Sequence, residues 1–459
     1  MKMNKHRHTT NIIDQNDREA YGMTRPARHA VLFTITCVLG IGAGFAQTDR
    51  QAFAAEPGQQ DTVRPAVGRP LRQAQALMAA QKYTAALVKI RQADAVRNKT
   101  RYEAFVVEEL RGFAEKGAGD SAAAIKSFET VIADGRLSKA DRARFAEEIA
   151  VEYYDIRDYP NAIQWAARYL EEGGDAAEIH TLLAQSYYLT GDFADAARQL
   201  QSEVNAALRA NHSPTESQLA MLADCALKEN DQSAYAAHLE QLVLFYPKKQ
   251  YWLSLLHQVE SSPDFADRLH LDLDRLKLAT GTLASPDDYL GMTELALADG
   301  LPGEARNTLE RGYAAGILGT GPGAERQNRL RNLVAKSITA DQGKLAQNLA
   351  QASQQRDGAD LVNIGQDYIS YGQTDKGIAL VEAGIGKGGL LHPEDARLRL
   401  GVAYLVASEK AKALQVLGTV HGTDGAGELA RLWTIYARQP ENVVTPASGS
   451  SATAARYQR

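Results

Sequence analysis

Residues 177–210 read AEIHTLLAQSYYLTGDFADAARQLQSEVNAALRA, and they form the clearest unit of a repeat that runs along the chain. Apolar residues such as Ile179 and Leu183 recur at helical intervals before a polar turn. The turn leads to an aromatic residue, Phe193, and three places later to a small one, Ala196. The pattern predicts a helix hairpin, in which alanine at the crossing lets the two helices approach closely.

The same turn pattern recurs along the chain. Its small residue returns at Ala86, Ala124, Ala162 and Ala196, at spacings of 38, 38 and 34 residues. One hairpin cannot bury its apolar face alone, so neighbouring hairpins must stack. On these residues the chain resembles the tetratricopeptide repeat (TPR) superfamily, whose units are about 34 residues long. The resemblance implies an all-α, TPR-like helix-hairpin solenoid that twists into a right-handed superhelix.

Composition and turn signals divide the chain into five parts. A glycine-rich stretch at 312–323 is predicted to be a long connection; a phosphate loop is disfavoured because no Lys-Ser/Thr pair follows it and no strand precedes it. The predicted parts are a signal peptide at 1–54, a linker at 55–70, an N-terminal TPR array at 71–247, a degenerate C-terminal array at 248–438 ending in a capping helix at 426–438, and a disordered tail at 439–459.

The first 54 residues have the features of an export signal. Arg25 and Arg28 precede an apolar run at 30–46, and small residues around Ala54 fit a signal peptidase. We therefore expect cleavage after Ala54 and a periplasmic location. The alternative is an uncleaved inner-membrane anchor at 30–46, which is near the lower length limit of a spanning helix. The sequence leaves open whether Met1 or Met23 is the true start.

Charge and cysteine content exclude two classes of function. Removing 1–54 leaves 44 basic and 52 acidic residues, a net charge of −8, with no basic stripe for nucleic acid. Cys37 lies in the signal and lacks a lipoprotein cleavage box, so lipidation is not expected. Cys225 then stands alone and is predicted to be a small core residue.

No arrangement of residues typical of catalysis is found in the sequence. The histidines of the mature chain lack metal-site spacing, and no nucleophile elbow or paired-cysteine motif occurs. The nearest thing to a ligand cluster is His270 with Asp272 and Asp274, which we interpret as a solvated polar surface because residues two apart on a helix diverge. We therefore predict no enzyme activity, no catalytic residues, no cofactor and no metal.

The resemblance implies that first helices line the inner surface of the array, where a protein or peptide partner would bind. Tyrosines, acids and amides suit an extended peptide because they stack on its side chains and bond its backbone. An equally weighted alternative is that Tyr154 and Tyr188 only continue the helical packing surface. The predicted groove residues are Glu147, Val151, Tyr154, Thr181, Gln185, Tyr188, Asp224 and Lys228.

The C-terminal half resembles envelope repeat proteins of Gram-negative bacteria that are associated with TonB-type energy-transducing systems. The resemblance lies in Leu276 to Gly281 with Tyr289, in 311–319, and in Leu398 to Gly401 with Tyr404. It implies a non-catalytic periplasmic adaptor, accessory to such a system. An envelope or cell-wall assembly factor and an enzyme with an unrecognised site are the alternatives. The sequence does not identify the partner or the oligomeric state.

Overall fold

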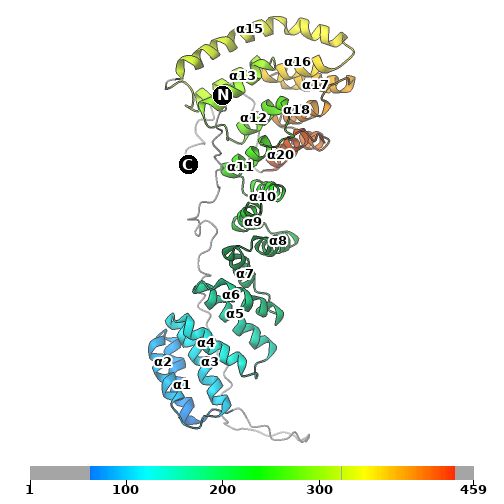
Figure 1. Cartoon of the computed structure of the whole chain (residues 1–459). Coiled ribbons are helices and arrows are strands. Elements are labelled where there is room, and N and C mark those ends of the chain that lie inside the picture. The colour runs from blue at the N-terminus through cyan, green and yellow to red at the C-terminus, as the bar shows by residue number, and fades with distance from the viewer. Residues whose placement is uncertain (1–61, 322, 440–459) are drawn as a thin grey trace, which may run out of the picture. The chain divides into compact units, whose positions relative to one another are not determined.

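The computed structural model describes residues 62–321 and 323–439, and the predicted signal peptide and most of the predicted tail lie outside these residues. All regular structure in this part of the chain is helical, which confirms the predicted all-α, TPR-like hairpin fold (Figure 1). The chain divides into two compact units between Gln232 and Ser233, whereas the sequence predicted a division at 247/248.

The first eight helices of the first unit come in consecutive pairs, and α9 follows them. They are α1 (Pro65–Ala79), α2 (Tyr83–Asp94), α3 (Arg101–Ala118), α4 (Ser121–Ala133), α5 (Lys139–Asp155), α6 (Tyr159–Glu171), α7 (Ala177–Thr190), α8 (Phe193–Arg209) and α9 (Glu216–Lys228).

The second unit begins with α10 and includes one helix much longer than the others. Its helices are α10 (Gln232–Phe245), α11 (Lys249–Glu260), the short 3₁₀ helix η1 (Asp267–Leu269), α12 (His270–Ala279), α13 (Pro286–Ala298), α14 (Pro302–Ala314), α15 (Ala324–Gln354), α16 (Ala359–Ser370), α17 (Thr374–Lys387), α18 (Pro393–Val406), α19 (Lys410–Leu417) and α20 (Ala426–Arg438).

Seven hairpins of the described chain turn through one residue in the left-handed region, five places before the small residue of the second helix. This conformation reverses the chain direction within a few residues, and glycine adopts it without strain. Non-glycine residues hold it in three of the hairpins. The turn residues and their φ values are Gln81 (57°), Gly119 (82°), Arg157 (64°), Gly191 (86°), Gly300 (76°), Gly372 (80°) and Ser408 (63°).

Both helices of a hairpin also carry a small buried residue, twelve positions apart. The pairs include Ala150 with Ala162, Ala184 with Ala196, and Gly365 with Gly377. A small side chain at both positions permits close approach of the two helices. This spacing explains why the alanines found by sequence comparison mark the repeat.

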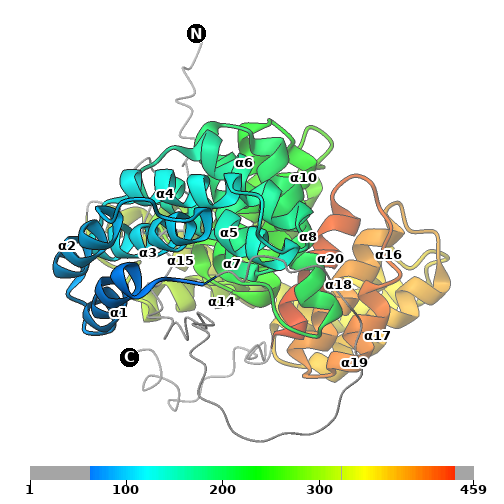
Figure 2. The same cartoon turned by 90° about the horizontal axis from the view of Figure 1, so that it is seen from below.

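The end of the second unit packs against its beginning. The side-chain amide of Gln439 donates to the carbonyl of Val243 at 2.7 Å, and the ring of Tyr436 lies 6.5 Å from that of Trp252. Helix α20 buries its apolar side, with Trp433 only 2% exposed, while Arg431 and Arg438 are exposed, and its role as a cap stays a prediction. Figures 1 and 2 show α20 beside α18, in agreement with their contacts.

A buried ion-pair network joins α12 to α14 and α18. Asp272, 1% exposed, accepts hydrogen bonds from Arg275 and, at 3.0 Å, from Arg399. Arg275 also pairs with Glu304 at 2.6 Å. The predicted solvated surface around His270 is therefore wrong for Asp272, which helical spacing turns toward neighbouring helices instead of solvent.

Candidate partner-binding site

The predicted groove residues lie on the first helices of three successive hairpins, α5, α7 and α9. We call the side of these helices that carries the eight residues the first-helix face. Interactions between neighbouring helices show that the side is shared: the Tyr154 hydroxyl donates to Gln185 Oε1 at 2.8 Å, and the Tyr188 hydroxyl donates to Asp224 Oδ2.

The two tyrosines occupy equivalent environments. Each ring packs edge-on against the aromatic residue that follows the turn of its own hairpin, with centroids 5.5 Å apart: Tyr154 on Tyr159, and Tyr188 on Phe193. Each hydroxyl then reaches the first helix of the next hairpin. Together these contacts form a ladder that fixes the spacing of the first helices, and a role for the tyrosines in partner contact stays a prediction.

Exposure divides the eight predicted residues into two groups. Three are buried, namely Tyr154, Gln185 and Asp224. The other five are reachable from solvent: Lys228 is exposed, and Glu147, Val151, Thr181 and Tyr188 are half-buried. The reachable group supplies most of the surface that a partner could contact.

Charged residues that the sequence reasoning missed complete this face. Arg144 pairs with Glu109 of α3 at 3.3 Å, and Glu178 stands on α7 beside Glu147 of α5. Arg144 and Glu178 lie three residues before Glu147 and Thr181, so helical periodicity could have identified them.

Two acids of the first-helix face, Glu147 and Glu178, lie close together, and the charge of Lys116 only partly offsets that of Glu147. Burial first, and then the neighbouring Glu148 and Glu178, raise the pKa of Glu147. Neither Glu147 nor Glu178 forms an ion pair with another residue of the described chain. Because Glu147 is half-buried and stands beside exposed Glu178, which adds a second negative charge, a positively charged group brought by a partner would be favourable here.

Other candidate chemistry was sought over the same described ranges. No group of three His, Cys, Asp or Glu residues there is placed to hold a metal ion. Cys225 is fully buried, as predicted, and burial raises the pKa of its thiol to about 12, so it is unreactive. Among residues 62–321 and 323–439, no helix has the length and apolar character needed to cross a membrane.

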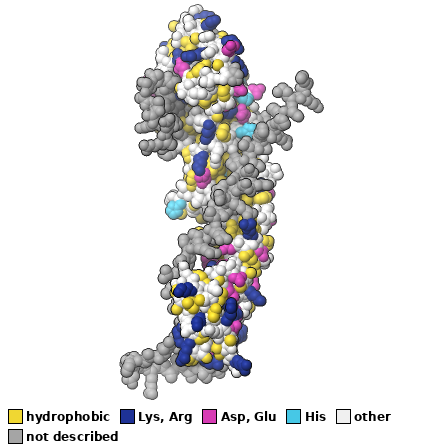
Figure 3. All heavy atoms as spheres, turned by 90° about the vertical axis from the view of Figure 1, so that its left-hand side faces the viewer, with side chains coloured by type: hydrophobic (Ala, Val, Ile, Leu, Met, Phe, Trp, Pro, Cys, Tyr) yellow, Lys and Arg dark blue, Asp and Glu magenta, His cyan; other side chains and the backbone are white. Residues whose placement is uncertain are grey.

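Figure 3 shows Lys and Arg side chains interspersed with Asp and Glu on the visible surface, in keeping with the scattered charges of the sequence.

Comparison with known proteins finds similarity among solved structures alone. No protein-family model matches the chain, and no curated protein matches it. It is similar to a complex of Naa15 and Naa10 bound to HypK-THB, with 16% identity over 79% of this chain and a TM-score of 0.30. The chain spans 58% of the length of that protein.

Two further solved structures are also similar to this chain. The C-terminal part of a TPR repeat-containing protein from Cytophaga hutchinsonii is 14% identical, covering 59% of this chain and 94% of that one, with a TM-score of 0.31. Yeast Tom70 is 10% identical, covering 81% and 95%, with a TM-score of 0.23. The description of the fold therefore rests on the hairpins of this chain itself.

Proposed function

We propose that this protein is a non-catalytic scaffold that binds a protein or peptide partner along the first-helix face. The observation that supports this proposal most is that the hydrogen-bonded tyrosines Tyr154 and Tyr188 lie on the same face as two acids, Glu147 and Glu178, that form no ion pair with other described residues. The ladder holds α5, α7 and α9 in register, so the reachable side chains are ordered before binding, which lowers the entropic cost of association.

The partner is proposed to present a basic side chain to Glu147 and Glu178. Complementary charge favours encounter and selects the partner's register. An extended peptide fits best, because it can place successive side chains over successive first helices.

Charge reversal tests this function. Glu147→Lys combined with Glu178→Lys leaves the tyrosine ladder intact, whereas removing Tyr154 or Tyr188 would disturb packing. Affinity capture followed by quantitative mass spectrometry should lose the partner with this double variant. The control is Glu171→Lys combined with Glu229→Lys, which reverses two exposed acids of the same unit that are not among the predicted groove residues. Equal capture by both variants would contradict the proposal.

We further propose that the protein works in the periplasm after cleavage at Ala54. The basic pair before the apolar run at 30–46 supports export. The mass of the protein purified from the cell envelope should correspond to a chain that begins at Ala55. A chain retaining 30–46 in the membrane fraction would favour the anchored alternative.

An accessory role in a TonB-type system is the pathway that we propose for this scaffold, on the sequence resemblance alone. Capture of an energy-transducing component or its receptor by the wild type, and its loss with the Glu147 and Glu178 double variant, would support this role. The alternative, cell-wall or envelope assembly, predicts instead that the mature protein binds purified cell-wall fragments.

A further inference from the structure

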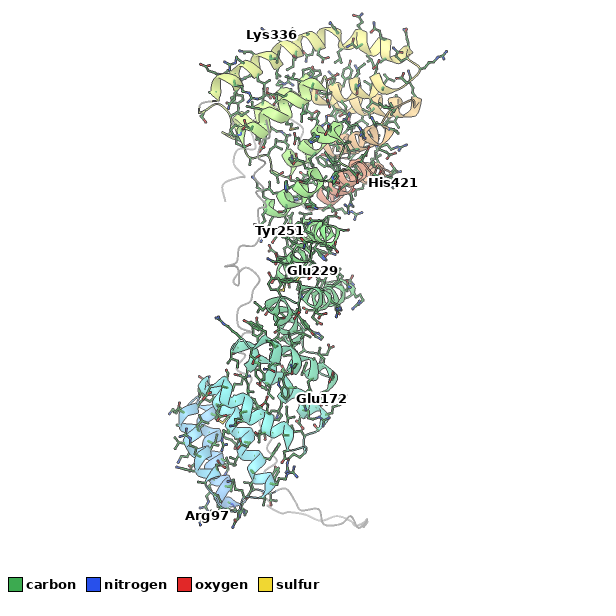
Figure 4. All side chains as sticks on the ribbon, viewed as in Figure 1. Arg97, Glu172, Glu229, Tyr251, Lys336 and His421 are labelled. Carbon is green, nitrogen blue, oxygen red and sulfur yellow. The ribbon has the colours of Figure 1, made fainter. Side chains whose placement is uncertain are left out.

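Helix α15 is held at both ends and crosses a polar junction in its middle. Leu330, Val334 and Ile338 join the apolar cluster of α13 and α14, while Leu345 and Ala352 join that of α16. Figures 1 and 4 show α15 arching beside α13 and α16, with Lys336 labelled on it.

Between Ile338 and Leu345 every residue is exposed except Asp341, which is half-buried. Its carboxylate accepts a hydrogen bond from the Tyr371 hydroxyl of α16 at 2.6 Å. The middle of α15 is therefore fastened to α16 by one polar contact, without apolar packing of its own.

Asp367 lies one turn before Tyr371 on α16, at the same junction. Its side chain is buried, 7% exposed, and its Oδ1 atom has no hydrogen-bond partner. A buried carboxylate is costly when ionised, and no protein donor bonds this Oδ1 atom to compensate its charge.

The charged groups around Asp367 do not compensate it either. Asp341 of α15 and Glu304 of α14 are both acids, and Glu304 is already paired with Arg275 through both of its oxygens. The charge of Arg306 of α14 lowers the pKa of Tyr371, and Arg306 is not among the groups that shift the pKa of Asp367.

Helix α17 also packs on α16, and its charged side chains make other contacts. Lys376 lies over the ring of Tyr368, with Nζ 3.8 Å from the centroid, and Glu382 accepts from the Tyr404 hydroxyl. Asp367 thus faces two carboxylates and no cation that neutralises it.

These surroundings change the titration of the junction. Burial first, then Asp341 and Glu304, raise the pKa of Asp367 to about 7. Burial and the hydrogen bond to Asp341 raise the pKa of Tyr371, which keeps its hydroxyl protonated as a donor.

We propose that Asp367 is a proton-binding site that sets how firmly the middle of α15 is held on α16. With the proton bound, the junction carries one charge fewer and α15 stays closed over it. When the proton leaves to solvent, the ionised carboxylate is stabilised if water reaches it. Water reaches it when the middle of α15 moves away from α16 while both apolar ends of α15 stay packed.

Hydrogen exchange of the full mature chain tests this proposal. Protection of amides in the middle of α15, corrected for intrinsic exchange, should fall about tenfold per pH unit between about pH 5 and about pH 6, and level off above about pH 7. The slope follows because Asp367 has an ordinary pKa near about 3.9 when the junction is open to water.

Asp367→Asn should make protection independent of pH over this range, because the amide keeps the shape and cannot ionise. Asp360→Asn, an exposed acid of the same helix, is the matched control and should keep the wild-type slope. A flat profile in the wild type, or an unchanged slope in Asp367→Asn, would overturn the proposal. The wild-type profile decides the matter even if Asp367→Asn does not fold.

Discussion

Glycine lets α16 and α17 cross at backbone contact. A Cβ atom on Gly377 would lie 2.5 Å from the carbonyl oxygen of Gly365 and 2.9 Å from the backbone nitrogen of Ile369. The second crossing point is tighter, since a Cβ on Gly358 would lie 1.8 Å from the carbonyl oxygen of Gly384. Backbone atoms cannot move aside as a flexible side chain can, so these positions exclude larger residues.

Gly377→Ala should therefore lower the free energy of unfolding by about 1–3 kcal/mol, through overpacking of the crossing. Gly386→Ala, on the same helix with open space around it, should raise that free energy by about 0.4–1 kcal/mol by restricting the unfolded chain. Urea unfolding of the two variants checks the opposite signs. A shared sign would contradict the close crossing.

The tyrosine ladder makes a second prediction for single residues. Tyr188→Phe removes the hydroxyl that donates to buried Asp224 and should cost about 1–3 kcal/mol of stability. Tyr187→Phe, on the same helix, should change stability by no more than about 0.5 kcal/mol. Thermal or denaturant unfolding measures both variants, and equal losses would show that the ladder contact contributes nothing.

At the scale of helices, the Asp272 network is expected to make the second unit acid-sensitive. Burial alone would raise the pKa of Asp272, but Arg399 and Arg275 outweigh it and hold the pKa below its usual value. A lowered folded-state pKa contributes stability above the unfolded value of about 3.9 and loses it as the pH falls through the folded value.

Asp272→Asn should weaken this acid dependence and destabilise the unit at neutral pH by about 3–5 kcal/mol, because it removes the buried carboxylate that pairs with Arg399 and Arg275. Unfolding curves between about pH 2 and about pH 7 provide the measurement. Asp287→Asn, an exposed acid on α13, serves as control. Stability that falls in acid equally in Asp272→Asn and the wild type would rule out Asp272 as the source.

Local spacing predicted the hairpins well, and long-range packing set the limits of prediction. The predicted helix at 426–438 forms as α20, because its apolar residues recur at helical intervals. The packing of its apolar side depends on contacts such as Gln439 with Val243, 196 residues apart, which no local pattern encodes. Helix α15 has few inward residues, so its 31 residues give a weak periodic signal.

The candidate site was predictable to a similar degree. Helical positions placed Tyr154 and Tyr188 on first helices, and periodicity could have added Glu178. That the tyrosine hydroxyls bond Gln185 and Asp224 depends on the register between neighbouring hairpins, which spacing within one hairpin does not determine.

At the scale of the whole molecule, the polar side chains of the candidate site are spread over successive first helices and are not gathered in one cluster. Ordered polar side chains recur on the first-helix face, and this distribution suits recognition of an extended chain better than a reaction at one point. The central claim is therefore spatial: a partner contacts first helices, and second helices serve as support.

Site-specific photo-crosslinking in cells tests this claim most directly. A crosslinking residue is placed singly at Glu147, Thr181 or Lys228 on the first-helix face, and at the exposed positions Gln164 of α6 and Ser202 of α8 as controls. We predict that one shared partner is captured from the three face positions and not from the controls. Capture of the partner from α6 and α8, with none from the face, would contradict it.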